Sequence, residues 1–196
     1  MIIALVGNKG GIGKTTSAVA LAAFLSSKGR TLLIDGDPNR SATAWARRGS
    51  LPFPIVGPEK SSEARLYDHV VVDSQAQPSK ADLKELADTC DLLILPSAPN
   101  ALDLDVLMVT CELLRSMGAT HYKALLTMIP PRPSREGDDA RAMLVGAGIP
   151  LFDGGIRRAV AHTKAALSGV PVYQAYDPRA AAAWADYQAI GEELLG

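Results

Sequence analysis

The apolar run Ile2-Ile3-Ala4-Leu5-Val6 leads into the glycine-rich octet Lys9-Gly10-Gly11-Ile12-Gly13-Lys14-Thr15-Thr16. Between a strand and a helix, such glycines let backbone N–H groups point at phosphate oxygens, and the helix adds the positive end of its dipole. The Lys14 ammonium can reach the β- and γ-phosphates, and the Thr15 hydroxyl can ligate Mg²⁺. The octet therefore predicts a site for a nucleoside triphosphate. The alternative is a glycine-rich turn beside solvated lysines.

Acidic residues follow two of the apolar runs further along the chain. Asp35 and Asp37 follow Leu32-Leu33-Ile34, and Asp73 follows His69-Val70-Val71-Val72. The carboxyl ends of parallel strands meet at one edge of a sheet, and ligands bind there. A carboxylate after a buried strand suits Mg²⁺, so we expect Asp73 to hold a metal-bound water. Strand-end acids such as Asp35 and Asp37 can instead cap the following helix.

Short β-branched runs alternate with longer amphipathic stretches, which predicts a doubly wound, mostly parallel sheet with helices on both faces. Strands are expected near residues 2–6, 31–35, 53–56, 69–73, 91–95, 123–128, 149–152 and 171–173. Helices are expected near residues 14–28, 39–48, 79–89, 102–117, 138–147, 158–168 and 178–195. Residues 49–66 and 129–137 are rich in Pro, Gly, Ser and charge, which is typical of loops. A length of 196 residues fits a single domain, 1–196.

The composition restricts the classes of function. The net charge is −1, so any contact with nucleic acid requires a local basic patch. The two cysteines, Cys90 and Cys111, are isolated, which argues against disulfides or zinc and fits a reducing cytosol. The sequence has no apolar run of membrane-spanning length and its last residues are acidic, so we expect no membrane partner.

The octet departs from the usual phosphate-loop pattern, because Asn8 replaces the first glycine and Lys9 adds a second lysine. It resembles the deviant Walker A box of the ParA/MinD family of P-loop NTPases. The segment Asp35-Gly36-Asp37-Pro38 is similar to the family's D-x-D-P switch, and Asp73 ends a Walker B pattern. The strand–Pro–x–x–Pro–helix layout of residues 91–104 also fits. The resemblance covers nearly the whole chain and implies ATP and Mg²⁺ as ligands.

The resemblance also implies roles for individual residues. Lys9 would contact the nucleotide of the partner subunit in an ATP-bound homodimer, and it joins Lys14 and Asp37 in the catalytic set. Asp37 would orient the water that attacks the γ-phosphate, and Asp35 would support Mg²⁺ beside Thr15 and Asp73. The remaining nucleotide contacts would be Gly10, Gly11, Gly13, Lys14, Thr15, Thr16, and, beside the adenine, Ile129 and Pro130.

Two further segments bear on the function. After Asp73 the family often has Thr-Pro-Pro, and here the chain has Ser74-Gln75-Ala76-Gln77-Pro78, so this switch would couple to partners in its own way. Arg157, Arg158 and Lys164 are expected at the start of a helix that would present cations to DNA phosphates near the dimer interface. The alternative for these three residues is a solvated helix face.

The chain is most similar in layout to small ParA partition ATPases without an N-terminal helix-turn-helix. These are cytoplasmic, nucleoid-associated Mg-ATPases that segregate plasmid or chromosome DNA when a ParB-like adaptor stimulates hydrolysis. A related ATPase that positions a protein cargo, such as carboxysomes, is the second hypothesis. An enzyme resembling dethiobiotin synthetase is a third. An iron protein like that of nitrogenase is excluded, because its cluster needs cysteines in another arrangement.

Overall fold

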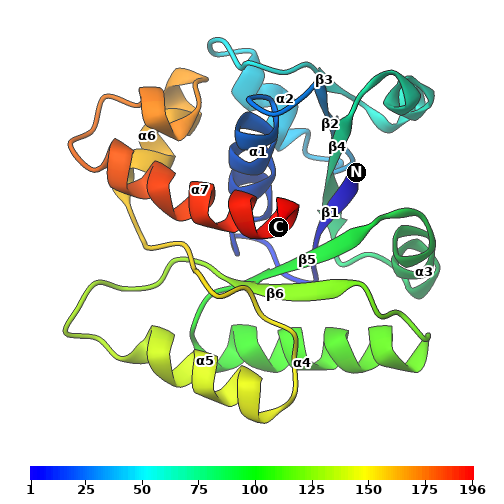
Figure 1. Cartoon of the computed structure of the whole chain (residues 1–196), viewed down its shortest axis with the longest axis vertical. Coiled ribbons are helices and arrows are strands. Elements are labelled where there is room, and N and C mark those ends of the chain that lie inside the picture. The colour runs from blue at the N-terminus through cyan, green and yellow to red at the C-terminus, as the bar shows by residue number, and fades with distance from the viewer.

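Six parallel strands form one sheet in the order β3-β2-β4-β1-β5-β6 (Figure 1). They are β1 (Ile2–Gly7), β2 (Thr31–Asp35), β3 (Ile55–Val56), β4 (His69–Ala76), β5 (Leu92–Ser97) and β6 (Tyr122–Leu126). The computed structural model describes residues 1–196. In the register of the sheet, Asp73 on β4 lies opposite Leu5 on β1 and opposite Asp35 on β2. The carboxyl ends of the central strands therefore meet at one edge, beside the glycine-rich octet.

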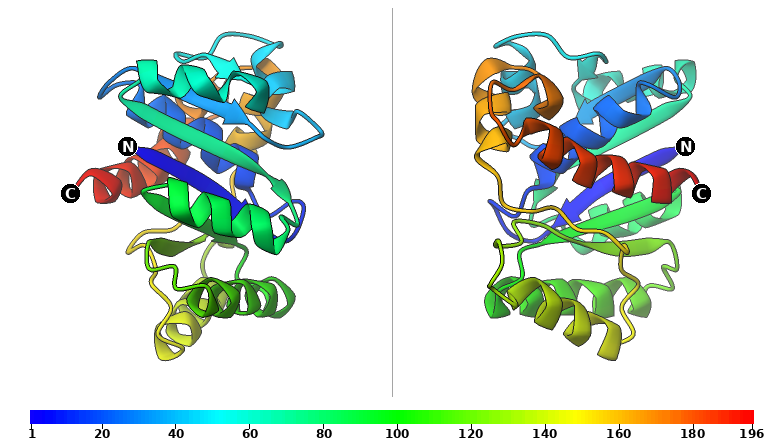
Figure 2. Two further views of the ribbon diagram at one scale, coloured as in Figure 1. Left: turned by 90° about the vertical axis from the view of Figure 1, so that its right-hand side faces the viewer. Right: turned by 60° about the vertical axis from the view of Figure 1, so that its left-hand side comes forward.

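Helices cover both faces of the sheet, as Figure 2 shows from two further sides. They are α1 (Lys14–Leu25), α2 (Ser41–Ala46), α3 (Lys80–Thr89), α4 (Ala101–Ser116), α5 (Glu136–Gly146), α6 (Val160–Ser168) and α7 (Ala180–Leu195). Apolar residues of α1, α2, α6 and α7 share one core, and those of α3, α4 and α5 share another on the opposite face. The predicted doubly wound fold is thus confirmed.

The close approach of α1 and α7 has a local cause in the sequence. Gly191 on α7 faces the ring of Phe24 on α1, and a Cβ at position 191 would lie 2.2 Å from that ring. Only a residue without a side chain permits this separation. One turn earlier, the hydroxyl of the fully buried Tyr187 shares a hydrogen bond of 3.0 Å with Ser17 on α1. α7 therefore supports the helix that follows the octet.

Three segments differ from the predicted secondary structure. Residues 149–152 form only an isolated bridge between Leu151 and Ala124, because Pro150 has no N–H to donate to a ladder. Residues 171–173 are not a strand; Val172–Gln174 form a short 3₁₀ helix, η2, closed locally by a bond from Gln174 N–H to the Pro171 carbonyl. The predicted loop 49–66 contains a 3₁₀ segment, η1 (Pro58–Leu66), and the strand expected near residues 53–56 is present there as β3. None of the helices combines the length and the apolar character needed to cross a bilayer.

Candidate active site

The octet forms a loop between β1 and α1, with Gly13 as the residue before the helix. Gly13 has φ of +90°, a conformation that favours glycine. The Thr127 hydroxyl, just after β6, donates a hydrogen bond of 2.9 Å to the Ile12 carbonyl and so stabilises the loop. A cavity of about 310 Å³ opens over the loop. It is lined by Gly10, Gly11, Gly13, Lys14, Thr15, Thr16, Asp37, Asn39, Ser41, Ala76 and Met128.

Lys14 is buried in the centre of this site, with a relative exposure of 6%. Its ammonium donates 3.0 Å to the carbonyl of Lys9, so the loop supplies its own acceptor. Burial lowers the pKa of Lys14, and the charges of Asp73 and Asp37 oppose that change. A phosphate oxygen in the cavity would replace a neutral carbonyl with an anion as partner, which favours the charged ammonium.

Two carboxylates lie side by side at the floor of the site. Asp35 and Asp73 are both fully buried, and neither oxygen of Asp73 has a hydrogen-bond partner. Burial raises the pKa of Asp73 to about 7; the Thr15 hydroxyl opposes this, and the charge of Asp35 adds to it. One Asp35 oxygen accepts from the Thr43 N–H and hydroxyl at 2.8 and 2.6 Å, while the other has no partner.

These unpartnered oxygens fit a magnesium ion. Mg²⁺ in nucleotide sites takes one or two carboxylates, waters and substrate phosphates rather than a complete protein cage. Accordingly, no group of three or more His, Cys, Asp or Glu side chains is arranged to hold a metal without further ligands. Asp73, Asp35 and the Thr15 hydroxyl therefore form a suitable oxygen donor set. Asp35 also accepts from Thr43 in the first turn of α2, as the helix-capping interpretation expected, and its role toward Mg²⁺ stays a prediction.

Asp37 lies at the wall of the phosphate-loop cavity, with 8% exposure. One of its oxygens accepts 2.8 Å from the Asn39 N–H, which fixes the turn around Pro38. Arg40 follows in the left-handed conformation, and its guanidinium donates to the Asp35 carbonyl and lies 3.6 Å from Glu59. Sequence reasoning missed Arg40, although its position directly after the D-x-D-P segment could have drawn attention to it.

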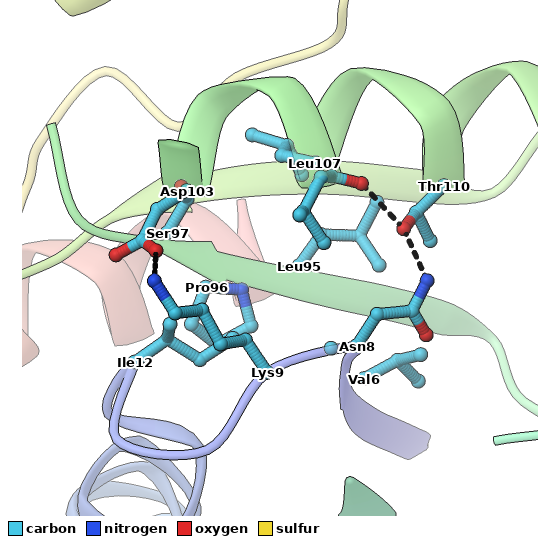
Figure 3. Close-up of a pocket in the computed structure, with 12 residues that line it drawn as sticks. Val6, Asn8, Lys9, Ile12, Leu95, Pro96, Ser97, Asp103, Leu107 and Thr110 are labelled. Atoms are coloured by element: carbon cyan, nitrogen blue, oxygen red, sulfur yellow. Dashed lines mark hydrogen bonds and ion pairs between the residues drawn. The ribbon is translucent and has the colours of Figure 1, made fainter. Parts of the chain in front are cut away.

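The first half of the loop is attached to α4, on the other face of the sheet (Figure 3). The Lys9 ammonium pairs with the buried Asp103 carboxylate, which also accepts 2.8 Å from the Asn100 side chain. The side chain of Asn8 donates 2.8 Å to the hydroxyl of Thr110, two turns further along α4. Asp103 lies in the first turn of α4, so the carboxylate that holds Lys9 also complements the helix dipole.

A second cavity, of about 480 Å³, adjoins the first at Gly13, Thr16 and Met128. Met128, with φ of +51°, lines both cavities and lies where the chain leaves β6. Ile129 instead pairs with Arg157 in an isolated bridge and lines a third cavity, and Pro130 lines none of these three. Met128 thus lies beside the phosphate loop, and the predicted adenine contacts of Ile129 and Pro130 stay a prediction.

The three cations predicted to contact DNA differ in whether a carboxylate already pairs with them. Arg157 and Arg158 precede α6 rather than opening it, because the helix begins at Val160. Arg157 is held by Asp186 at 2.7 Å, and Lys164 by Asp177 at 2.9 Å. Arg158 has no acidic partner and lines both the 480 Å³ cavity and the third cavity. Of the three residues, Arg158 is the one whose charge is not neutralised.

The chain is similar to known proteins along nearly its whole length. A family model described as "AAA domain" matches residues 1–115. The protein named "Maintenance of carboxysome distribution protein A" from Gloeobacter kilaueensis is 39% identical over 98% of this chain and 93% of its own length. Its namesake from Halothiobacillus neapolitanus is 27% identical over 88% of this chain and 86% of its own. In fold, the chain matches the MinD cell division protein of Aquifex aeolicus, with a TM-score of 0.79 at 18% identity, over 100% of this chain and 97% of that one.

Proposed function

Because the chain belongs to the ParA/MinD family of P-loop ATPases, we propose that it is an Mg-ATPase whose ATP-bound dimer positions a protein cargo of the carboxysome kind. The observation that carries the enzymatic part is that Lys14 and Asp37 line one phosphate-loop cavity and that the charge of the buried Asp73, paired in register with Asp35, acts on Lys14. The cargo is supported by the 39% identity to a carboxysome distribution protein over almost the full chain.

In this proposal the loop N–H groups and Lys14 bind the β- and γ-phosphates. Lys14 exchanges the Lys9 carbonyl for phosphate oxygens and keeps its proton. Thr15, Asp73 and the free oxygen of Asp35 would hold Mg²⁺, which neutralises charge on the β- and γ-oxygens when bound. Asp37 uses one oxygen for the Asn39 N–H, so the other is available to orient the attacking water.

The proposed ATP-dependent dimer depends on Lys9. In the single chain its ammonium is held by Asp103 rather than by its own phosphate site. A triphosphate on the partner subunit is a stronger anion than one carboxylate, so Lys9 would leave Asp103 when two ATP-bound chains meet face to face. Closure would exclude water and strengthen the electrostatic interactions at the phosphates.

The sequence placed DNA segregation first and a protein cargo second, and the relatives favour the second over the first. Non-specific DNA remains part of the proposal as the surface on which the dimer is retained. Arg158 is the residue best suited to a backbone phosphate, because Arg157 and Lys164 already have carboxylate partners. Two subunits would double this weak patch, which makes DNA affinity depend on dimerisation.

Capture of partners by the ATP-loaded Asp37→Ala variant tests the proposal. Loss of the water-orienting carboxylate should slow hydrolysis by about 100-fold or more while ATP still binds, so the dimer persists with its partner. A pull-down from the native host should recover an adaptor associated with a protein compartment. Recovery of a centromere-bound adaptor would return DNA segregation to first place. Rapid hydrolysis by this variant would remove Asp37 from the mechanism.

A further inference from the structure

His162 is a half-buried histidine whose two ring nitrogens are shielded from solvent and make no hydrogen bond within the chain. It lies on α6 and lines the 480 Å³ cavity that adjoins the phosphate loop. Its Nδ1 and Nε2 are both shielded from solvent, and neither has a hydrogen-bond partner. Buried nitrogens without partners are uncommon in native proteins, and each calls for a physical explanation. A ligand in the cavity is one such explanation.

The neighbours of His162 fix the orientation of its ring but form no hydrogen bond with its nitrogens. Its ring meets the ring of Tyr187 edge-on, with 5.7 Å between the centroids. The Tyr187 hydroxyl is occupied by Ser17, and the Arg157 guanidinium by Asp186. Turning the imidazole by half a revolution about its Cβ–Cγ bond exchanges each nitrogen with a carbon. The ring can therefore offer a different atom to the cavity without any movement of α6.

The chemistry of the ring suits a nucleobase better than a phosphate. Burial lowers the pKa of His162, while the nearby Arg157 backbone and the charge of Asp186 oppose that change, so the ring is neutral near pH 7 and carries one N–H donor and one acceptor nitrogen. An adenine edge likewise combines an amino donor with a ring-nitrogen acceptor. The cavity shares Gly13, Thr16 and Met128 with the phosphate-loop cavity, so a nucleotide bound at the loop extends its nucleoside this way.

We propose that His162 is a base-contacting residue of the ATP site, with a ring nitrogen hydrogen-bonded to the adenine. The inference rests on the proposed function, because it assumes that the loop binds ATP. It assigns the base contact to α6, about thirty residues beyond Ile129 and Pro130, which the sequence analysis had expected beside the adenine.

The test compares two ligands, Mg-ATP and Mg-tripolyphosphate, by calorimetric titration of the full chain. His162→Leu should weaken ATP binding about 5- to 30-fold, the effect of losing one hydrogen bond, and leave tripolyphosphate affinity unchanged. His162→Gln, which keeps a donor and an acceptor, should recover most of the ATP affinity. Equal weakening of both ligands, or no weakening of ATP, would overturn the assignment. If the wild-type chain binds neither ligand, the proposed function itself fails.

His69 supplies the matched control. It begins β4, its Nδ1 is also buried without a partner, and it does not line the cavity. His69→Leu should therefore leave the affinity for both ligands unchanged. Should His162→Leu fail to fold, the wild-type chain still decides the matter: the ¹⁵N resonances of His162 should move on addition of Mg-ATP and stay in place with Mg-tripolyphosphate. Resonances of His162 that do not move on addition of Mg-ATP would contradict the proposal.

Discussion

The two lysines of the phosphate loop, five positions apart, lie in opposite surroundings. Lys14 is almost fully buried, and its ammonium stays within the loop. Lys9 keeps 47% of its side-chain exposure and is held from outside the loop, by Asp103 on α4. The position of Lys14 follows from local backbone geometry, whereas that of Lys9 depends on a helix far away in the sequence. One half of the loop is thus built for binding phosphate and the other for responding to a partner.

The largest effect is expected in the buried half. Lys14→Ala removes the only ammonium in the centre of the site, so charge on the transferring phosphoryl group loses its main protein partner. We expect kcat for ATP to fall about 100- to 1000-fold in a phosphate-release assay. Lys14→Arg keeps the charge and serves as the control for fold. Near-normal turnover by Lys14→Ala would show that the two lysines do not differ in the way described.

Lys9→Ala addresses the partner-facing half. Removing one member of a charge pair across a desolvated interface typically costs about 2–5 kcal/mol, so ATP-dependent dimerisation should weaken at least about 30-fold. Binding of ATP to the single chain should change less than about threefold. Analytical ultracentrifugation measures the first quantity, and calorimetry the second. A variant that dimerises normally with ATP would contradict the role given to Lys9.

Asp103→Asn should act in the opposite direction and more weakly. It releases the ammonium of Lys9 from its partner within the chain, so less ATP should be needed for dimerisation. Because Lys9 is half exposed, the pair contributes only about 0.2–1 kcal/mol, equivalent to a shift of less than about fivefold. Glu112→Gln, on an exposed part of the same helix, is the matched control. If Asp103→Asn requires more ATP instead, Asp103 serves the dimer and does not hold Lys9 back.

The smallest effect is expected at Asn8. Asn8→Gly restores the glycine of the common phosphate-loop pattern and removes the hydrogen bond to Thr110, at a cost of about 1 kcal/mol. The melting temperature should fall by about 2–4 °C, because unfolding entropy scales with chain length. Differential scanning calorimetry, with Thr110→Val as the second arm of a double-mutant cycle, measures the coupling. Additive effects of the two changes would mean that this bond contributes nothing to stability.

Local patterns were sufficient to predict the six strands of the sheet, the phosphate loop and the acidic residues at the strand ends, but not the irregular segments 149–152 and 171–173. Each depends on short spacings, such as a buried run followed by a glycine turn or by an aspartate. The contact of Lys9 with Asp103 was not predictable in this way, since it arises from the packing of α4 beside β1. The left-handed backbone of Met128, which brings its side chain to both cavities, was likewise not predictable from local patterns, because few residues other than glycine adopt a positive φ.

The contact of Gly191 with Phe24 sets the distance between α7 and α1. Tyr187, one turn earlier on α7, contacts the ring of His162, so this distance also affects the cavity wall at His162. An alanine at this position would place its Cβ against the Phe24 ring and push the two helices apart. A glycine in the final helix thereby sets how closely α7 approaches the helix that follows the phosphate loop.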